Sequence, residues 1–563
     1  MNTARKLFYY NGGFLRQKRV RRILSMAGYE LTLGLPDRGD MVAVWGQSPN
    51  QYRGQWIAKK RKAGLLRVED AFLRSVQPGR AGDPPLGLIL DRSGCHFDAS
   101  YPCDLENILR HDPLKDTDLL CRAEQAIMRI RDNHISKYNA FETTQSPPAP
   151  GYVLVIDQTF GDAALRASGA GKAEFKAMLA AARREHPDAN IIIKSHAETI
   201  LGHRRGYFSA ADATDTIRLL ATPISPWQLF DGAIAVYTIS SQMGFEAILA
   251  GHTPHVFGQP FYAGWGLSKD RKPTTGRTRI LSRAQLFAAA MILYPIWYDP
   301  YRDRLCALED VLDILEAQSR AWRDDHRGWV ACGMRLWKRP HLQSIFGRSK
   351  RIIFQNNLAK AHHTSTRHQR NLMVWASGHQ DLAFPTTRIE DGFLRSRGLG
   401  ATLTPPLSLV ADRLGIYYDP RAPSQLEQMI ADTVTLRPDQ KARAERLRQQ
   451  VIGAGLTKYN AGQTAAEITG TRRILVPGQV EDDASILTAA GDIKTNLALL
   501  TAVRRANPDA IILYKPHPDV EAGLRLGAVP DRDAAASADR VLTNTDPGTL
   551  LTQIDEVWTM TSL

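Results

Sequence analysis

Short, wholly apolar segments alternate with stretches of helical periodicity along this chain. The strand-like runs are MVAVW at 41–45, YVLVI at 152–156, NIIIK at 190–194 and AIAVYTI at 233–239. Helical patterns lie between them, for example Ala173–Arg184 and Leu119–Arg131. Because buried strands that alternate with helices are typical of crossover connections, the pattern predicts an α/β protein with parallel sheets.

The same pattern occurs twice, at a constant offset of 321 residues. EDAFLRS at 69–75 recurs as EDGFLRS at 390–396, KYN at 137–139 recurs at 458–460, and PDANIIIKSH at 187–196 recurs as PDAIILYKPH at 508–517. Upstream, Trp45 matches Trp375 at an offset of 330, so the first copy carries nine extra residues there. An offset that is constant over such a length predicts two copies of one fold.

Each copy is predicted to contain two Rossmann-like subdomains that face a cleft, the arrangement known as GT-B. The segment FETTQSPPAPG at 141–151 is rich in Pro, Thr and Ser and reads as a linker between them. We therefore expect a first module at 1–325, with subdomains at about 1–145 and 150–300, and a second at 326–563, with subdomains at about 330–465 and 470–563.

Composition and charge narrow the possible functions. The five cysteines have no paired or metal-type spacing, the longest apolar run (Leu286–Leu293) is too short to span a bilayer, and the basic N-terminus lacks the apolar core of a signal peptide. We expect a cytoplasmic protein. The net charge of +14 is compatible with a solvated basic surface, an anionic membrane surface or anionic small substrates. Since no nucleic-acid-binding signature is present, we expect no nucleic-acid partner.

Two motifs that follow strands in the second subdomain could bind phosphate. Lys194 and His196, matched by Lys515 and His517, pair a point charge with a hydrogen-bond donor, although a histidine here could simply bond local backbone. Ser240 and Ser241 precede a helix whose free amides could hold an anion, although simple helix capping is the alternative. The related nucleotide-binding candidates are Gln158, its counterpart Gln479, Glu246 for a ribose hydroxyl, and Thr561 and Ser562, which match the two serines.

Carboxylates supply the candidate catalytic groups. Glu69 and Asp70, matched by Glu390 and Asp391, follow a strand of the first subdomain and face the expected cleft. Arg74 and Arg395 follow four residues after each Asp, so an ion pair or a cap is the alternative reading. Asp162 and Asp483 occupy a loop in both copies and could act as nucleophile or general base, whereas Asp157 is replaced by Gly478. No metal-binding pattern is present, so we expect metal-free chemistry without a cofactor.

These motifs together resemble a known family. EDGFLRS (390–396), GQVEDDAS (478–485), KPHPD (515–519), SSQ (240–242), GFEAILAG (244–251) and PFYAGWGL (260–267) resemble the capsule-polysaccharide β-Kdo transferases of the KpsC/LipB type. The resemblance covers nearly the whole chain. It implies a retaining transferase that uses CMP-β-Kdo and builds an oligo-Kdo linker, with alternating 2→4 and 2→7 linkages, on a phosphatidylglycerol terminus. A partner transferase supplies the first Kdo. For this chain we expect a cytoplasmic location, with a peripheral position at the inner membrane left open.

The resemblance also assigns roles. Asp162 and Asp483 match the proposed nucleophile, Asp70 and Asp391 the acid of the EDG motif, and His196, His517, Ser240 and Ser241 the CMP contacts. Arg74 and Arg395 are then plausible partners for the Kdo carboxylate. The first copy departs from the pattern at Ala71 and Ala197, which leave the acid and the histidine in place.

Two other functions stay open: a transferase of another CMP- or UDP-sugar on the same fold, and a non-catalytic scaffold that binds saccharide or lipid. Leu563 corresponds to Gln242, so the second copy lacks the counterpart of the helix at Gly244–Gly251. We therefore expect a C-terminally truncated second module that binds CMP poorly while the first copy remains active.

Overall fold

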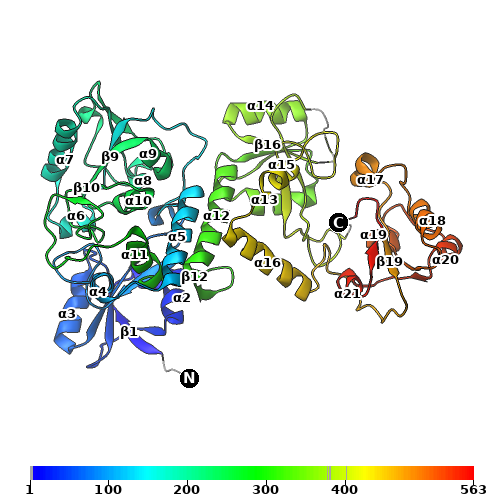
Figure 1. Cartoon of the computed structure of the whole chain (residues 1–563), viewed down its shortest axis with the longest axis horizontal. Helices are drawn as coiled ribbons and strands as arrows, with labels where there is room; N and C mark the ends of the chain where they lie inside the picture. Colours follow the sequence, from blue (N-terminus) through cyan, green and yellow to red (C-terminus); the bar gives the residue numbers. More distant parts are fainter. Residues whose placement is uncertain (1–3, 377, 379–381, 401, 563) are drawn as a thin grey trace. The chain divides into compact units, whose positions relative to one another are not determined.

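The computed structural model describes residues 4–376, 378, 382–400 and 402–562 (Figure 1). The chain divides into two compact units, Met1–Asp324 and Asp325–Leu563. The position of Leu563, on which the comparison with Gln242 depends, lies outside the described residues.

The first unit begins with a mixed seven-stranded sheet in the order β13-β12-β5-β4-β3-β1-β2. Its strands are β1 (Arg5–Tyr9), β2 (Tyr29–Thr32), β3 (Met41–Trp45), β4 (Gly64–Asp70), β5 (Gly87–Asp91), β12 (Ile296–Asp299) and β13 (Arg304–Cys306). Strands β1 to β4 pair in parallel, but β4–β5, β5–β12 and β12–β13 are antiparallel. The prediction of parallel sheets thus holds for β1 to β4 but not for β5, β12 and β13, because the chain returns from β4 to β5 without a crossover helix.

The second sheet of this unit is parallel throughout, in the order β11-β10-β9-β6-β7-β8. Its strands are β6 (Tyr152–Ile156), β7 (Ile191–Lys194), β8 (Ile217–Leu220), β9 (Ala233–Thr238), β10 (His255–Val256) and β11 (Lys269–Asp270). Val153 and Val155 of β6 pack with Phe175 of α7, whereas Leu154 packs in the cluster that contains Phe230 of α9. Both faces of the sheet are covered, which explains why its strands lack a polar face.

Twelve α-helices follow in chain order in the described part of this unit: α1 (Gly13–Arg16), α2 (Lys18–Met26), α3 (Gln51–Arg61), α4 (Asp104–His111), α5 (Thr117–Asp132), α6 (Ala163–Ala167), α7 (Lys172–Glu185), α8 (Ala197–Ile200), α9 (Pro226–Gly232), α10 (Gln242–Ala250), α11 (Arg283–Phe287) and α12 (Leu308–Asp325). The helices expected at Ala173–Arg184 and Leu119–Arg131 are present as α7 and α5 within two residues at each end. The expected linker at 141–151 contains no named helix or strand.

The second unit contains a five-stranded sheet, β15-β14-β16-β17-β18, and a four-stranded sheet, β21-β20-β19-β22. The strands are β14 (Trp329–Cys332), β15 (Ile353–Gln355), β16 (Asn371–Trp375), β17 (Thr387–Asp391), β18 (Leu409–Asp412), β19 (Arg473–Pro477), β20 (Ile511–Lys515), β21 (Arg540–Val541) and β22 (Glu556–Val557). The helices are α13 (Arg339–Phe346), α14 (Leu358–His368), α15 (Gln425–Asp432), α16 (Pro438–Gly453), α17 (Ala484–Ala489), α18 (Asn496–Ala506), α19 (Pro518–Glu521), α20 (Asp531–Ser537) and α21 (Pro547–Leu551). As in the first unit, the paired acids end one strand (β17) and the Lys–His motif ends another (β20).

Within the part of the chain that the structure describes, no helix combines the length and apolarity needed to cross a bilayer. All five cysteines are free thiols.

Candidate active site

The loop that carries Lys137 connects the two sheets of the first unit. The backbone N–H groups of Arg74 and Ser75 donate to the carbonyl of Lys137, at 3.2 and 3.4 Å, and Asn139 donates its amide to the carbonyl of Ser75 at 3.0 Å. The Tyr138 ring lies edge-on to the His196 ring, with centroids 6.3 Å apart. The KYN motif therefore joins the loop after β4 to the loop after β7.

Lys137 is the centre of charge in this site, and the sequence analysis did not assign it a role. Burial lowers its pKa, but the charges of Tyr138, Asp70, Asp162 and Glu69 act in the opposite direction and leave the pKa above its usual value. The Lys137 ammonium therefore interacts electrostatically with three carboxyl groups that are predicted to be catalytic. The recurrence of KYN in both copies was the sequence signal that could have identified it.

The two acids at the end of β4 have different environments. Burial, with the neighbouring charge of Asp70, raises the pKa of Glu69 to about 8, so this carboxyl holds a proton at neutral pH. Asp70 accepts from Arg74 Nε through Oδ2 at 2.6 Å, while its buried Oδ1 has no hydrogen-bond partner among the described residues. An oxygen in that condition is poised to accept a hydrogen bond from a ligand.

Arg74 is committed to protein partners. Besides Asp70 it donates from Nη1 to the Ser75 hydroxyl at 2.9 Å and to the Asp83 carbonyl at 2.7 Å, and only 6% of the residue is exposed. The ion pair that the sequence left as an alternative is therefore present. A sugar carboxylate could bind this guanidinium only through N–H groups that Asp70, Ser75 and Asp83 do not occupy.

Asp162 lies at the N-terminus of α6, where its Oδ1 accepts the backbone N–H of Ala164 at 2.8 Å. Its Oδ2 accepts no hydrogen bond from the residues that the structure describes. The charge of Asp162 raises the pKa values of Glu69, Lys137 and His196. Asp157 is buried and accepts the backbone N–H groups of Gln158 and Tyr207 at Oδ1, while its Oδ2 has no hydrogen-bond partner among the described residues.

His196 is held in one tautomer. Its Nδ1 accepts the backbone N–H of Glu198 at 3.1 Å, so the neutral ring carries its proton on Nε2. Burial, helped by the charge of Lys137, lowers the pKa of His196 to about 4. Burial also lowers the pKa of Lys194 to about 8, and its ammonium donates to the Thr222 carbonyl at 3.1 Å. The motif presents one neutral N–H donor beside one cation.

A second group of residues lies at the N-terminus of α10. Gln158 accepts the Ser240 N–H at 3.0 Å and donates to the Ser240 hydroxyl at 3.3 Å, while Ser241 caps the helix through the Met243 N–H. Glu246, on the same helix, is 4% exposed and accepts the Ser136 hydroxyl at 2.8 Å. Its Oε2 has no partner among the described residues, and burial raises its pKa to about 7. This oxygen is suited to a ligand hydroxyl.

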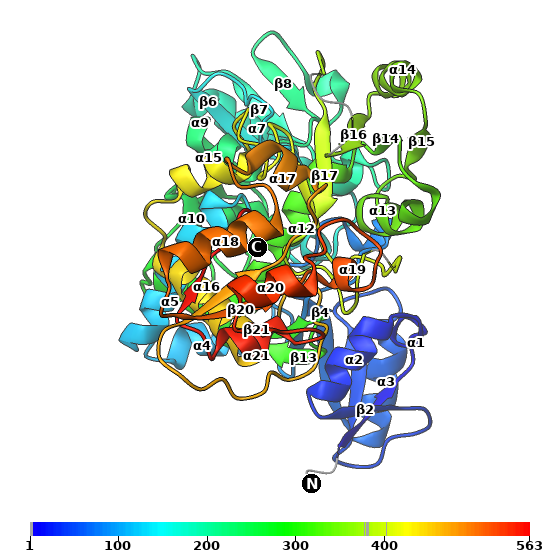
Figure 2. The same cartoon turned by 90° about the vertical axis from the view of Figure 1, so that its right-hand side faces the viewer.

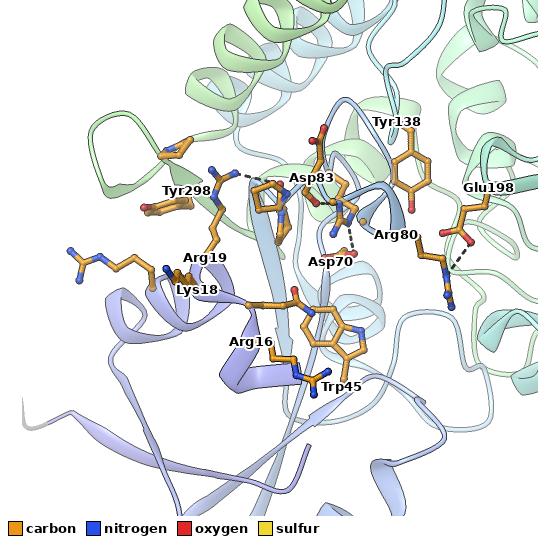
Figure 3. Close-up of a pocket in the computed structure, with 18 residues that line it drawn as sticks. Arg16, Lys18, Arg19, Trp45, Asp70, Arg80, Asp83, Tyr138, Glu198 and Tyr298 are labelled. Carbon is orange, nitrogen blue, oxygen red and sulfur yellow. Dashed lines mark hydrogen bonds and ion pairs between the residues drawn. The ribbon is translucent and has the colours of Figure 1, made fainter. Parts of the chain in front are cut away.

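A cavity of about 990 Å³ is lined by Asp70, Arg74 and Tyr138 of this site (Figure 3). Asp162, His196 and the residues at the N-terminus of α10 are not part of its lining. Asp70, Tyr138 and Glu198 lie along one side, and Arg16, Lys18 and Arg19 come from the α1–α2 segment. Arg80, in the turn before β5, pairs with Glu198 of α8 at 3.7 Å beside the cavity. The dense positive charge fits an anionic ligand next to the acid of β4.

Several contacts of the first unit recur in the second. Arg395 Nε donates to Asp391 Oδ2 at 2.6 Å, and the Arg395 N–H donates to the Lys458 carbonyl at 3.0 Å. Asp519 N–H donates to His517 Nδ1 at 3.1 Å. Gln479 accepts the Thr561 N–H at 2.9 Å and donates to the Thr561 hydroxyl at 2.8 Å.

Some further counterparts match the first unit, in which Ser241 N–H donates to Thr238 Oγ1 at 3.3 Å, whereas the contacts of Lys515 and Asp483 differ from those of Lys194 and Asp162. Ser562 N–H donates to Thr559 Oγ1 at 3.0 Å, and Lys515 Nζ donates to the Pro516 carbonyl at 3.4 Å. Burial raises the pKa of Glu390 to about 7. Asp483 is exposed, and Ser485 donates to it from both its backbone N–H and its hydroxyl, at 3.0 and 2.8 Å.

No group of three or more His, Cys, Asp or Glu residues within 4–376, 378, 382–400 and 402–562 has the arrangement of a metal site.

Residues 40–296, 363–466 and 457–563 match the family described as capsule polysaccharide biosynthesis protein. The chain belongs to this family.

Individual members of the capsule polysaccharide biosynthesis family show how far the similarity extends. Two proteins named Capsule polysaccharide modification protein LipA are similar over most of the chain. The one from Neisseria meningitidis serogroup B is 38% identical over 93% of this chain and 77% of its own length. The one from serogroup A is 36% identical over 100% of this chain and 83% of its own. The predicted family is confirmed, with the relatives named LipA rather than LipB.

A solved structure supports the same family. Thermosulfurimonas dismutans KpsC, beta Kdo 2,4 transferase, is 33% identical, with a TM-score of 0.53, and the match covers 56% of this chain and 99% of that one.

Proposed function

We infer that this member of the capsule polysaccharide biosynthesis family is a retaining β-Kdo transferase. It moves Kdo from CMP-β-Kdo onto a Kdo-primed, phosphatidylglycerol-type lipid and so builds the oligo-Kdo linker of capsular polysaccharide. Each unit acts as a GT-B module with two Rossmann-like subdomains. The observation that carries this proposal is the buried Oδ1 of Asp70, unpartnered among the described residues, next to the KYN loop, which bonds the loop after β4 and sets Tyr138 against the His196 ring.

In the first step Asp162 attacks the anomeric carbon of Kdo. A bond forms between its free carboxylate oxygen and that carbon, and the bond from carbon to the CMP phosphate oxygen breaks with its electron pair going to CMP. His196 donates from Nε2 to the departing phosphate, Lys194 supplies a positive charge, and the N-terminus of α10 supplies backbone dipoles. Glu246 accepts a hydrogen bond from ribose through its unpartnered Oε2.

In the second step an acceptor hydroxyl displaces Asp162, and two inversions give net retention. Asp70 takes the hydroxyl proton on Oδ1, the oxygen that Arg74 leaves unpaired. Arg74 thereby acts as a positioning residue for Asp70, and Arg395 does the same for Asp391. Lys137 balances the charge of the carboxylates throughout.

The reaction is tested with purified protein, CMP-Kdo and a synthetic, soluble Kdo acceptor, with the product linkage read by NMR. A Kdo adduct on Asp162 in intact-mass spectra supports the covalent step. CMP-sialic acid and UDP-sugars serve as competing donors. Preferential transfer from either of those, or no transfer from CMP-Kdo, contradicts the proposal.

A further inference from the structure

An apolar groove lies at the end of the first sheet, outside the candidate active site. Its volume is about 820 Å³. We call it the apolar groove and define it by the residues that form its apolar walls: Leu15, Leu33, Tyr52, Trp56 and Ile57. The segments that contribute them include α1 and α3, which lie together with α2 and β2 in Figure 2. No step of the proposed reaction uses these side chains.

The large side chains of the apolar groove are open to solvent. Leu33, Tyr52 and Trp56 are 68%, 58% and 59% exposed, and Leu15 is 48% exposed. Scattered apolar residues are normal on a surface, but several large ones that line a single groove mark an interaction site.

Cations surround this groove. Along α3, Tyr52, Trp56, Lys59 and Lys60 follow at spacings that place them on one side of the helix. Lys60 Nζ lies 4.8 Å from the Trp56 ring centroid, and the Arg53 guanidinium carbon lies 5.7 Å from that of Tyr52. Aromatic rings beside lysine and arginine are typical of surfaces that enter the headgroup region of a membrane.

The charge of the whole protein is concentrated in this part of the chain. Residues 1–63 contain thirteen Lys and Arg but only three acids, a net charge of +10 out of the total of +14. A surface that combines exposed aromatic side chains with such an excess of cations complements an anionic lipid bilayer.

The groove also adjoins the candidate active site. Leu15 lines the apolar groove, and the next residue, Arg16, lines the basic cavity that reaches Asp70. A bilayer in contact with the groove would therefore hold a lipid-linked anion at the mouth of that cavity.

We propose that the apolar groove and its rim, Arg53, Lys59 and Lys60, form the surface by which this chain docks on an anionic phospholipid membrane. The orientation of the acceptor toward Asp70 rests on the proposed function, but the docking itself does not. Tyr52 and Trp56 insert at the headgroup level, and the lysines contact lipid phosphates.

The test is sedimentation of the full chain with phosphatidylcholine vesicles prepared with and without phosphatidylglycerol. The wild type should bind the anionic vesicles preferentially. Tyr52→Ser/Trp56→Ser should lower partitioning by about tenfold or more, because two rings lose their apolar contact. Lys59→Gln/Lys60→Gln should lower it by about fivefold for each cation removed. Brominated lipid should quench part of the tryptophan fluorescence of the wild type, and this quenching should be lost in Trp56→Ser.

The matched control is Ile280→Ser/Tyr301→Ser, which changes two other side chains that are 83% and 69% exposed. It should bind vesicles as the wild type does. Equal binding by the control and the Tyr52→Ser/Trp56→Ser variant, equal binding to neutral vesicles, or no binding at all would overturn the proposal, and the last outcome would favour a protein partner for the groove.

Transfer to a soluble acceptor separates this proposal from the proposed function. The groove variants should keep that activity and lose transfer to acceptor lipid in vesicles. If the wild type binds anionic vesicles but transfers no Kdo to any acceptor, the proposed function fails while the docking surface stands.

Discussion

Glu69 and Asp70 are adjacent in sequence but experience different surroundings. Glu69 is turned into a site where burial and the charges of Asp70 and Asp162 disfavour its ionised form. Asp70 is held by Arg74 at one oxygen and left unpartnered at the other, within the described residues. Neighbouring carboxyls that differ in this way can take different roles in one reaction.

Glu69 should make stability depend on pH. Its pKa rises from 4.5 to about 8 on folding, so the folded state holds the proton more tightly. The resulting stabilisation is complete below 4.5 and is lost as pH rises through about 8. Glu69→Gln should therefore be more stable than the wild type above about pH 8, by about 1–3 kcal/mol, and equally stable below pH 4.5. Parallel thermal melts at both extremes measure this, and parallel pH profiles for the two proteins would contradict it.

Lys137 should matter through its charge. Lys137→Met leaves Glu69, Asp70 and Asp162 without their shared cation, so kcat should fall by about a hundredfold or more. The pH at which the rate reaches half its maximum should also move upward, since the carboxyls ionise less readily. Lys137→Arg should retain much of the rate. The exposed Lys176 on α7 provides the control Lys176→Met, and a fall in rate without a shifted pH profile would indicate a merely structural role for Lys137.

Sequence reasoning identified individual site residues better than their partners. The recurrence of Asp70, Asp162 and His196 was visible from spacing, because each follows a strand. The role of Lys137 was missed, since its proximity to those residues depends on how the KYN loop bonds the loop after β4. Arg74 was offered both as an ion-pair partner and as a ligand for substrate, and only the folded geometry shows the hydrogen bonds that occupy it.

At the scale of elements, the ends of strands and the starts of helices organise the site. Gln158, after β6, bonds Ser240, after β9, so one amide fixes the loop that leads into α10. The helices and the parallel sheet were predictable from periodicity, because both faces of that sheet are covered. The antiparallel half of the first sheet was not, because the apolar strands β4 and β5 give no signal of direction.

Gln158→Met should loosen the loop before α10. The loss of two hydrogen bonds to Ser240 should raise KM for CMP-Kdo by about three- to tenfold with little change in kcat. Steady-state kinetics against donor concentration measures this. Gln259→Met, which removes one side-chain bond to the Pro273 carbonyl, is the control, and an equal rise in KM there would contradict the assignment.

At the scale of the whole molecule, the two units share their contacts but not their carboxylate exposure. Asp162 and Asp483 both accept hydrogen bonds through Oδ1, but Asp162 is half-buried whereas Asp483 is exposed. Because a nucleophile reacts faster when it is desolvated, the first unit is the better prepared of the two.

Asp162→Ala should therefore reduce transfer by three orders of magnitude or more, while Asp483→Ala should leave the linkage made by the first unit unchanged. Initial rates on the soluble acceptor, with NMR of the products, separate the two. CMP binding by Asp162→Ala, measured by calorimetry, verifies that the site is intact. Near-normal transfer by that variant excludes Asp162 as the nucleophile.

Transfer should proceed without divalent metal, because Lys194, His196 and the N-terminus of α10 supply the charge and donors for the leaving phosphate. Rates measured in EDTA should equal those in buffer alone. An absolute requirement for Mg²⁺ or Mn²⁺, restored by adding it back, would contradict this prediction.

The edge of the first sheet has a consequence for how the protein is made. Strands β12 and β13 close that sheet, with Trp297 packed where Gly87 has no side chain, yet they follow the whole second sheet in the chain. A ribosome must therefore release more than 300 residues before the first sheet can be completed. Until then the edge of β5 stays unpaired, and the nascent chain exposes it to other chains. The first sheet therefore cannot be completed without the chain that follows the second sheet. A gene fragment that ends in the 141–151 linker should yield a product that aggregates.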